Sequence, residues 1–308
     1  MSSDRRRLII ILGPTGVGKS EAAVHLALRF GGEIINADSM QVYRGFDIGT
    51  AKPSLEDRRR VPHHLLDIVD PSVQFTAADF AGRAADAVRL IQERRRLPFV
   101  VGGTGLYLRS LVDGLFPGPG RDPAMRARLE SEVRTSGLDS LRKELERVDP
   151  VYAGLIGPRD KVRIVRALEV YALTRRPISE HFSKTKPPLE DWLPVKIGLS
   201  LDRPALYKKI EQRVDRMFRD GLVEEVRNLL GRGIPESAPP FRALGYKHAV
   251  RCVRREITVE EAARLTKLDT RHFAKRQMTW FRKMTGVTWL PADDPAGLAA
   301  RLEGEIAA

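Results

Sequence analysis

The chain has 308 residues, which is enough for about two domains and for a sizeable buried core. Its 42% apolar and 30% charged residues are typical of a globular protein, and no apolar run approaches the roughly 20 residues that a membrane-spanning helix needs. The 53 Lys and Arg against 40 Asp and Glu give a net charge of +13, which favours a nucleic-acid partner, although a solvated basic surface would give the same balance.

The cysteine content and the first residues both bear on the cellular compartment. Cys252 is the only cysteine, which excludes an internal disulfide and a cysteine-rich zinc site. The start, MSSDRRRLIIILG, places basic residues before an apolar run, as a secretion signal does. The run is short and leads straight into GPTGVGKS without a small-residue cleavage site, so a buried strand is the better interpretation. We therefore expect a cytoplasmic protein.

The first part of the chain alternates strand patterns with helix patterns. Short apolar runs end in glycine or in a carboxylate, and longer stretches repeat apolar residues at helical spacing. This alternation predicts an α/β fold with a doubly wound parallel sheet, which binds ligands at the carboxyl ends of its strands. The predicted strands are 8–12, 33–37 and 98–101, and the predicted helices are 19–29 and 79–96.

The alternation stops at GLFPGPGRDP, residues 114–123, a loop dense in proline and glycine. Asp122 and Pro123 have the pattern of an N-cap and a first helical residue. Two further helix patterns follow, at 139–147 and 160–174. This part of the chain therefore reads as an all-helical insertion between two linkers.

A second proline-rich stretch, KTKPPLEDWLP, ends at Pro194 and precedes a strand pattern at 195–199. The remainder is mostly helical, and Thr258 and Glu261 have the spacing of a capping box at the head of a long basic helix. We therefore predict an α/β core in two parts with the insertion between them. The predicted domains are 1–120 for the first part of the core, 121–190 for the helical insertion, and 191–308 for the second, mostly helical part of the core.

The stretch GPTGVGKS follows the first predicted strand and opens the first predicted helix. In this context the spacing G-x-x-x-x-G-K-S predicts a loop whose backbone N–H groups converge on phosphate oxygens, helped by the positive end of the helix. Lys19 adds a positive charge, and the Ser20 hydroxyl suits Mg²⁺, which we expect as the cofactor. The predicted cradle is Gly13, Pro14, Thr15, Gly16, Val17, Gly18, Lys19 and Ser20.

The loop specifies phosphate but not a particular nucleotide. A kinase or ATPase usually shows an apolar strand ending in an aspartate for Mg²⁺, but here FVVGGT ends in glycine and Thr104. The strand at 33–37 does end in a carboxylate, Asp38, which is either a metal-side carboxylate or a general base. An ATP-dependent kinase of a small molecule or nucleotide explains the cradle but leaves the basic charge and the insertion without a role. A noncatalytic, nucleotide-gated RNA-binding protein is the third possibility.

The stretch NADSMQVYRGFDIGTAKP, residues 36–53, resembles the signature of the tRNA dimethylallyltransferases, also called tRNA isopentenyltransferases, and in particular the bacterial type. PHHLLDIVDP, GGTGLYLRSL, RALEVY, IEQRVDRMF, ALGYK and KRQMTWFRK occur in that family in the same order, so the resemblance covers nearly the whole chain. It implies transfer of the dimethylallyl group from dimethylallyl diphosphate to the exocyclic amino group of an adenosine, giving isopentenyladenosine. That adenosine lies just 3′ of the anticodon, in tRNAs that read codons beginning with U.

The resemblance also implies the partners and the catalytic residues. The cradle would hold dimethylallyl diphosphate, the macromolecular partner would be the anticodon stem-loop of tRNA, and we expect a monomer without a membrane partner. Asp38 would take a proton from the amino group, and Thr104 would contact the diphosphate near its bridging oxygen, where negative charge grows. Arg213 would also hold the diphosphate, since its fork geometry suits phosphate. The alternatives are an N-cap or turn role for Asp38 and a solvated helix arginine for Arg213.

The tRNA contacts implied by the resemblance lie in three segments. The adenosine must leave its stack to reach the general base, so base flipping is expected. For a single arginine in these segments, a solvated helix face is an equally good interpretation. Trp280 and Phe281 could stack on bases, but their spacing favours the core. The implied contacts are Asp38, Ser39, Met40, Gln41 and Thr104 around the adenosine, Arg126, Val162, Arg163, Ile164, Val165 and Arg166 in the insertion, and Arg242, Ala243, Leu244, Gly245, Tyr246 and Lys247 in the core.

Overall fold

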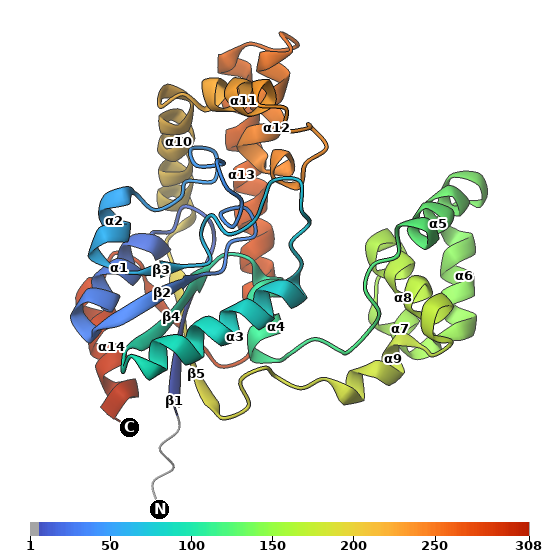
Figure 1. Ribbon diagram of the computed structural model, residues 1–308, viewed down its shortest axis with the longest axis horizontal. Coiled ribbons are helices and arrows are strands. Elements are labelled where there is room, and N and C mark those ends of the chain that lie inside the picture. Colours follow the sequence, from blue (N-terminus) through green and yellow to red (C-terminus); the bar gives the residue numbers. More distant parts are fainter. Residues whose placement is uncertain (1–5, 308) are drawn as a thin grey trace, which may run out of the picture. The chain divides into compact units, whose positions relative to one another are not determined.

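The computed structural model describes residues 6–307, which fall into two compact units (Figure 1). One unit combines residues 6–112 with 188–307, and the other is residues 113–187. The second unit starts and ends a few residues before the expected insertion at 121–190, and its first and last segments meet in an antiparallel bridge between Leu115 and Lys186. Each unit has an apolar core of its own.

The first unit is built on a six-stranded sheet in which every pairing is parallel (Figure 1). The order of strands across the sheet is β3-β2-β4-β1-β5-β6. The predicted α/β class with a parallel sheet is confirmed. The strands are β1 (Arg6–Leu12), β2 (Gly32–Asn36), β3 (His63–His64), β4 (Leu97–Gly102), β5 (Trp192–Ser200) and β6 (Val287–Pro291).

Side chains of the central strand β1 alternate between the two faces of the sheet. Ile9 and Ile11 belong to one apolar cluster, and Leu8, Ile10 and Leu12 belong to another. Because helices cover both faces, the strand reads as a continuous apolar run rather than as an alternating pattern. Helices α1 (Lys19–Phe30), α14 (Pro295–Ala307), α10 (Arg203–Arg219) and α13 (Val259–Phe281) contribute side chains to the first cluster. Helices α3 (Ala77–Glu93) and α4 (Gly105–Val112) contribute side chains to the second.

Helix α3 is shifted by two or three residues from its predicted range of 79–96. It begins after Thr76, whose hydroxyl accepts from the Asp79 N–H while the Asp79 carboxylate accepts from the Thr76 N–H. This capping box places the start two residues earlier. The helix ends at Glu93 because Arg95 has a left-handed backbone (φ 56°), although the charged run of residues 94–96 continues the helical pattern.

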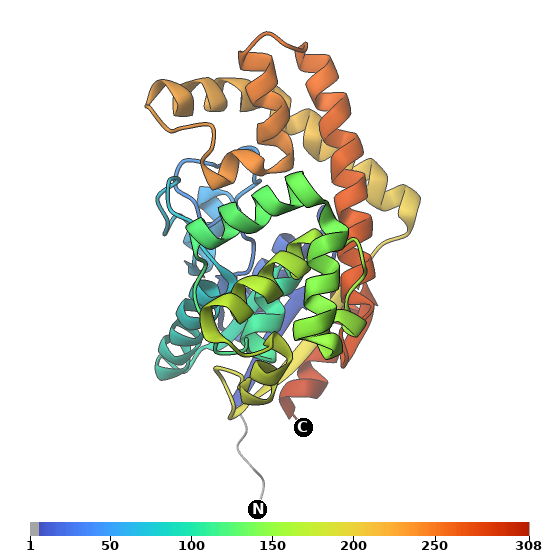
Figure 2. The same ribbon diagram turned by 90° about the vertical axis from the view of Figure 1, so that its right-hand side faces the viewer.

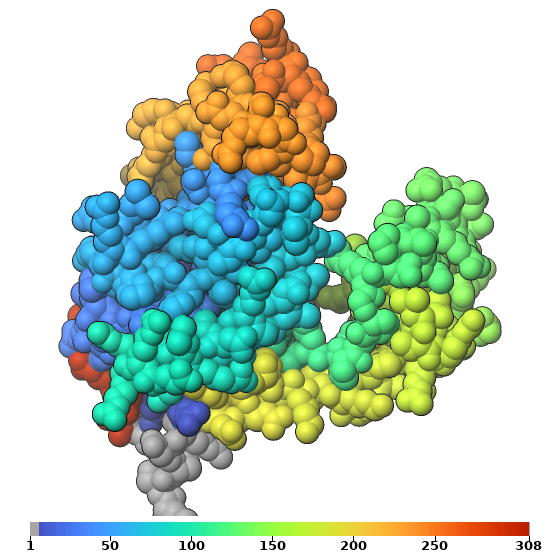
Figure 3. Space-filling view, in the orientation of Figure 1, coloured from blue at the N-terminus to red at the C-terminus, as the bar shows by residue number. Residues whose placement is uncertain are grey.

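A third apolar cluster joins the segment after β2 to the helices that follow β5. Phe46 from that segment and Tyr246 are fully buried, with ring centroids 4.9 Å apart. In the space-filling view this segment, blue to cyan, lies against the orange helices (Figure 3). The helices of this region are α10 (Arg203–Arg219), α11 (Leu222–Gly231), η2 (Pro239–Arg242), α12 (Leu244–Val253) and α13 (Val259–Phe281), and α2 (Leu55–Arg60) precedes β3.

The long helix α13 begins where the sequence predicted. The Thr258 hydroxyl accepts from the Glu261 N–H. Phe281, at its last turn, is fully buried and Trp280 packs beside it, so the expected core role of this pair is confirmed. Strand β6, in contrast, was not predicted, because its partly exposed residues show neither alternation nor a continuous apolar run.

The second unit is a helical bundle with its own core, drawn in green and yellow-green in Figure 2. Asp122 caps its first helix and Pro123 is the first helical residue, as predicted. Leu141, Leu145 and Ile164 are completely buried in this core. The elements are α5 (Pro123–Ser136), α6 (Leu138–Val148), α7 (Pro150–Leu155), α8 (Lys161–Thr174), α9 (Ile178–His181) and η1 (Phe182–Lys184).

Among the described residues we find no helix whose length and apolar character would let it span a bilayer.

Candidate active site

Three loops meet at the carboxyl edge of the sheet. The phosphate loop follows β1, Asp38 follows β2, and Thr104 follows β4. Strand β4 lies between β1 and β2, and its Gly102 and Val101 are paired with Leu12 and Asn36 at the ends of these strands. Because adjacent strands lie about 4.8 Å apart, the three loops are neighbours in space although about 90 residues separate the first from the last.

The phosphate loop has the backbone that an anion cradle requires. Gly16 and Gly18 have φ of 82° and 105°, which L side chains rarely adopt. Helix α1 begins directly after Gly18 without a side-chain cap, so its first N–H groups and its positive end are available to a ligand. The Lys19 ammonium lies over the loop and donates to the Pro14 carbonyl at 2.8 Å.

Positive charge is concentrated beside this loop. Burial and, to a lesser extent, the Arg213 guanidinium together lower the pKa of Lys19 to about 7, while the Asp38 carboxylate opposes both effects. Burial also lowers the pKa of Arg213, again opposed by Asp38. Two cations and one carboxylate therefore share a partly desolvated space, which favours the binding of an anion.

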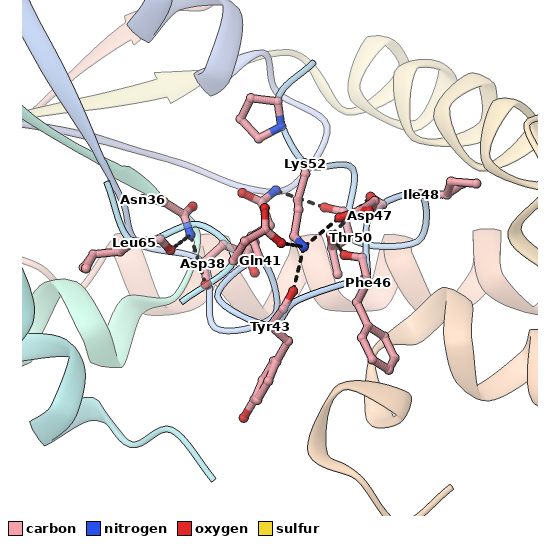
Figure 4. A network of polar contacts seen from close by, with 12 residues as sticks. Asn36, Asp38, Gln41, Tyr43, Phe46, Asp47, Ile48, Thr50, Lys52 and Leu65 are labelled. Carbon is pink, nitrogen blue, oxygen red and sulfur yellow. Dashed lines mark hydrogen bonds and ion pairs between the residues drawn. The ribbon is translucent and has the colours of Figure 1, made fainter. Parts of the chain in front are cut away.

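Asp38 is held in a turn, with one carboxylate oxygen left for chemistry. Its Oδ1 accepts from the Met40 N–H at 2.8 Å, and among residues 6–307 its Oδ2 has no hydrogen-bond partner. The side chain of Asn36 donates to the Asp38 carbonyl at 3.4 Å and to the Leu65 carbonyl at 3.3 Å, which fixes the backbone at this point (Figure 4). No helix begins at Asp38, so the N-cap alternative is excluded. The turn role is present, because Oδ1 accepts from the Met40 N–H, but it leaves Oδ2 available.

Thr104 ties the β4 loop to the β2 loop. Its N–H donates to the Ala37 carbonyl at 3.3 Å, and its Oγ1 accepts from the Ser39 N–H at 3.1 Å. The hydroxyl also lies 3.4 Å from Ser39 Oγ, to which it donates. The side chain is thus held next to Asp38 with a hydroxyl proton that a ligand could receive instead of Ser39.

Arg213 reaches from α10 into the site. Its Nη1 donates to Thr15 Oγ1 at 3.3 Å and its Nη2 donates to the Thr50 carbonyl at 3.4 Å. Both acceptors are neutral, and among the described residues no carboxylate oxygen lies within 4.0 Å of this guanidinium. Arg213 is therefore held inside the site and is not a solvated arginine on the helix surface.

A cavity of about 310 Å³ lies among these groups. Thr15, Asp38, Thr104 and Arg213 all line it, so the structure brings the predicted catalytic residues together. Helix residues that the sequence did not single out complete the wall, since their spacing is also that of ordinary core residues. They are Ile210, Val214 and Met217 of α10, and Thr266, Thr270, Phe273 and Arg276 of α13.

A buried lysine shapes the segment that carries Asp38 (Figure 4). The Lys52 side chain is 2% exposed, and its Nζ donates to the Tyr43 carbonyl at 2.6 Å and to Asp47 Oδ1 at 2.7 Å, as well as to Asp67. Gln41 faces into the same segment, where its Nε2 donates to backbone carbonyls at 3.0 and 3.1 Å. The Gln41 side chain is therefore committed to the segment, while Ser39 and Met40 line the cavity.

The predicted tRNA contacts of the core divide between the cavity and the interior. Residues 242–245 line the cavity. Tyr246 is 0% exposed, accepts from the Gly49 N–H at 3.2 Å and donates to Glu225. Its side chain therefore cannot contact tRNA in this conformation. Lys247 remains at the surface, paired with Asp269 at 2.6 Å.

In the second unit, two of the predicted arginines serve a buried carboxylate. Glu169 is 0% exposed, and Arg126 donates to it through Nε at 2.9 Å and Nη2 at 3.0 Å. Arg166 donates to the same carboxylate at 2.6 Å. Arg163 is different, because half of its side chain is exposed and the nearest carboxylate, Asp160, lies at 3.5 Å.

The predicted run of residues 162–166 cannot act as one surface. Val162 is 74% exposed, whereas Ile164 and Val165 are 0% and 4% exposed in the core of the unit. Side-chain contacts from Ile164 and Val165 to tRNA are therefore excluded. The reason is helical periodicity, which turns consecutive residues of α8 to different faces.

The sequence matches known families over most of its length. A family model described as IPP transferase matches residues 41–284, and one described as isopentenyl transferase matches residues 6–71. The chain belongs to the IPP transferase family. It is therefore a transferase that acts in tRNA modification.

Individual relatives of this IPP transferase agree. It is 51% identical over 287 residues to the tRNA dimethylallyltransferase of Geobacter metallireducens, covering 93% of each chain, and 47% identical over 289 residues to that of Geobacter sulfurreducens. Its fold matches the crystal structure of the tRNA isopentenylpyrophosphate transferase from Bacillus halodurans with a TM-score of 0.72 at 40% identity, covering 98% of this chain and 97% of that one. A eukaryotic dimethylallyltransferase described as acting on tRNA matches with a TM-score of 0.79 at 29% identity, covering 98% of this chain and 77% of that one.

Proposed function

We propose that this transferase moves the dimethylallyl group from dimethylallyl diphosphate to the exocyclic amino group of the adenosine 3′ to the anticodon. The observation that carries the proposal is the single cavity shared by Thr15 of the phosphate loop, Asp38, Thr104 and Arg213. It places an anion cradle beside a carboxylate with a free oxygen. The family comparisons favour this reaction over the alternative of an ATP-dependent kinase.

The donor binds through its diphosphate. The first N–H groups of α1, the Lys19 ammonium and the Arg213 guanidinium supply positive charge to the phosphate oxygens. The Lys19 ammonium, now bonded to the Pro14 carbonyl, turns to the phosphate. Burial and the nearby Arg213 disfavour the charged form of Lys19, and the negative charge of the bound donor stabilises that form.

The transfer step forms a bond between the adenosine nitrogen and the first carbon of the dimethylallyl group. The bond from that carbon to the bridging oxygen breaks, and its electron pair leaves with the diphosphate. The Thr104 hydroxyl donates to this oxygen as charge develops there. Asp38 Oδ2 accepts the proton that the amino nitrogen releases, which contributes a factor of about 10²–10⁴ in rate for a typical general base.

A magnesium ion fits the phosphate loop. The Ser20 side chain, the first hydroxyl of α1, is exposed beside the cradle and suits a hard cation that also binds phosphate oxygens. We find no group of three or more His, Cys, Asp or Glu side chains among the described residues that could hold a metal, so the diphosphate would supply further ligands. The ion would neutralise the charge of the leaving diphosphate.

The acceptor is the anticodon stem-loop of tRNA, and its adenosine must flip out of the stack to reach Asp38. Residues 242–245 line the cavity and supply contacts to the base, while Arg163 of the second unit supplies an exposed charge for the phosphate backbone. The net charge of +13 suits such a polyanion. We propose that the enzyme works as a monomer in the cytoplasm, where tRNA is available to it.

Supplying labelled dimethylallyl diphosphate together with tRNA, and ATP in a separate reaction, tests the proposal. We expect the label in tRNA at the adenosine 3′ to the anticodon, and no ADP from ATP alone. ADP formation without transfer of the label would support the kinase alternative instead.

A further inference from the structure

One buried side chain that the sequence did not single out joins two loops of the site. Gln277 lies on α13 and is 7% exposed. Its Oε1 accepts from the Thr15 N–H at 2.8 Å, and its Nε2 donates to the Gly103 carbonyl at 2.8 Å. Thr15 belongs to the phosphate loop and Gly103 precedes Thr104, so one amide spans the two loops.

Gln277 occupies a position of α13 at which helical periodicity predicts an apolar side chain. Ala274 and Phe281, three residues before it and four after it, are buried on the same face of α13. A polar group in such a place is stable only when its hydrogen-bonding groups are satisfied. Here both ends of the amide are satisfied, and the partners are backbone groups of the two binding loops.

We propose that Gln277 is a positioning residue, which sets the phosphate loop in register with Thr104. The inference rests on the proposed function, since it takes the phosphate loop as the diphosphate site. Thr104 in turn accepts from the Ser39 N–H next to Asp38, so the amide is the first link between the cradle and the general base. A misplacement of about 1 Å between such groups can cost about 100-fold in rate.

The space between the loops fits this amide. A Cβ on Gly103 would lie 2.4 Å from Gln277 Nε2, so a glycine is needed for the side chain to reach the carbonyl. Thr15 is also held from its other side, where its hydroxyl accepts from Arg213 at 3.3 Å. The backbone of Thr15 is therefore fixed by α13 and its side chain by α10.

Gln277→Glu removes the donor to Gly103, keeps the acceptor for Thr15, and adds a negative charge beside the phosphate loop. The carboxylate can still accept from the Thr15 N–H, but it faces the Gly103 carbonyl with a second acceptor instead of a donor. Protonation restores the donor, and burial raises the pKa of a carboxyl group. We expect kcat/KM for dimethylallyl diphosphate about tenfold below wild type at about pH 8, with the ratio to wild type recovering as the pH is lowered to about 6.

Gln277→Leu removes both hydrogen bonds at similar volume. We expect a loss of about ten- to a hundredfold in kcat/KM for the donor at every pH, with a matching loss in the affinity for inorganic diphosphate and an unchanged Kd for tRNA. Gln74→Glu is the matched control for the charge, because Gln74 is exposed in a loop before α3. The kcat/KM of Gln74→Glu for dimethylallyl diphosphate should equal that of wild type across the same pH range.

Gly103→Ala reaches the same contact from the other side, so the test does not depend on one variant folding. We expect a loss in kcat/KM for the donor no larger than that of Gln277→Leu, because Gly103→Ala disturbs only one of the two hydrogen bonds. The double variant should be little worse than Gln277→Leu, which has already lost that contact. Wild type that neither binds inorganic diphosphate nor transfers the prenyl group would overturn the proposed function itself. The positioning role would be overturned if wild type binds diphosphate and transfers the prenyl group, but Gln277→Leu has the same kcat/KM as wild type. It would also be overturned if the kcat/KM of Gln277→Glu relative to wild type does not change with pH.

Discussion

The two units use partly buried arginine in opposite ways. In the second unit, Arg126 and Arg166 surround Glu169, whose carboxylate is completely buried. In the first unit, Arg213 donates only to a hydroxyl and a carbonyl, with Lys19 nearby. An arginine matched by a carboxylate stabilises a fold, whereas a desolvated arginine without one is ready for an anionic ligand. The comparison separates a structural site from a binding site without reference to sequence motifs.

Arg213→Ala should give the largest effect on catalysis and almost none on folding. We expect kcat/KM for dimethylallyl diphosphate to fall by about 10²–10³, since a charged donor to the diphosphate is lost. The melting temperature should be unchanged or higher, because a desolvated cation has been removed. Steady-state kinetics and thermal unfolding measure the two effects. A large loss of stability would mean that Arg213 is a structural residue like Arg126.

Arg126→Ala should give the reverse pattern. Glu169 would keep Arg166 but lose its bidentate partner, and the second unit should lose about 3 kcal/mol of stability. Glu169→Gln in the same chain should restore part of it, because no unpaired carboxylate remains. Chemical denaturation of the single and double variants measures both changes. Unchanged stability in Arg126→Ala would show that the pair is dispensable and would return Arg126 to the candidates for tRNA contact.

Acid should weaken the second unit through the same carboxylate. Burial raises the pKa of Glu169, but hydrogen bonds from Arg126 and Arg166 outweigh it and hold the pKa below its ordinary value. A depressed folded-state pKa stabilises the protein above the unfolded-state pKa, and this contribution is lost as the pH falls through the folded-state pKa. Denaturation followed on the acid side should therefore show less pH dependence in Glu169→Gln than in wild type. Equal dependence would assign the acid sensitivity to other carboxylates.

Lys19 should take up a proton when the donor binds. Its pKa is about 7 in the free site, and a bound diphosphate raises this pKa, so near pH 8 binding adds a proton to the neutral amine and forms the ammonium. Affinity should accordingly fall as the pH rises above about 7, by at most tenfold per pH unit. Calorimetry with inorganic diphosphate in buffers of different ionisation enthalpy counts the proton. Lys19→Met is the control, since the titration of diphosphate itself remains; an equal uptake in this variant would contradict the role of Lys19.

The smallest effect is expected at Arg163, whose half-exposed side chain is paired only with Asp160, at 3.5 Å. Arg163→Ala should reduce the slope of log tRNA affinity against log salt by the contribution of about one phosphate contact, without changing donor affinity. Arg96→Ala is the matched control, because Arg96 is exposed at the amino end of β4, at the edge of the sheet opposite to the phosphate loop. Equal slopes for wild type and Arg163→Ala would place the tRNA elsewhere.

The predictable parts of the site are those that follow strands. The phosphate loop, Asp38 and Thr104 each come directly after an apolar run, and parallel strands bring such positions to one edge. The contacts of Gln277 could not be predicted, because its partner Thr15 lies 262 residues away and a single polar residue in a helix pattern does not indicate which group it bonds. The contacts of Lys52 lie in a loop, where no periodic pattern indicates which side chains meet. The only signal for Gln277 was a polar residue in line with buried Ala274 and Phe281.

In the second unit the sequence placed the helices but misjudged their surfaces. A contiguous run implied by resemblance ignores the helical period, so Ile164 and Val165 were grouped with exposed Val162. Arg126 was separated from Glu169 by 43 residues, and the sequence offered no reason to join them. Short elements such as α7 and α9 were missed because six and four residues are too few to show periodicity.

The proposed mechanism depends above all on Asp38 as the general base, and single-turnover prenyl transfer by Asp38→Asn measures that role. The amide keeps the shape and the contact to the Met40 N–H but cannot accept the proton. With donor and tRNA binding unchanged, we predict a rate of transfer lower by about 10²-fold or more. A rate near that of wild type would show that Asp38 holds the turn without acting as the base, and Asp47 would become the next candidate.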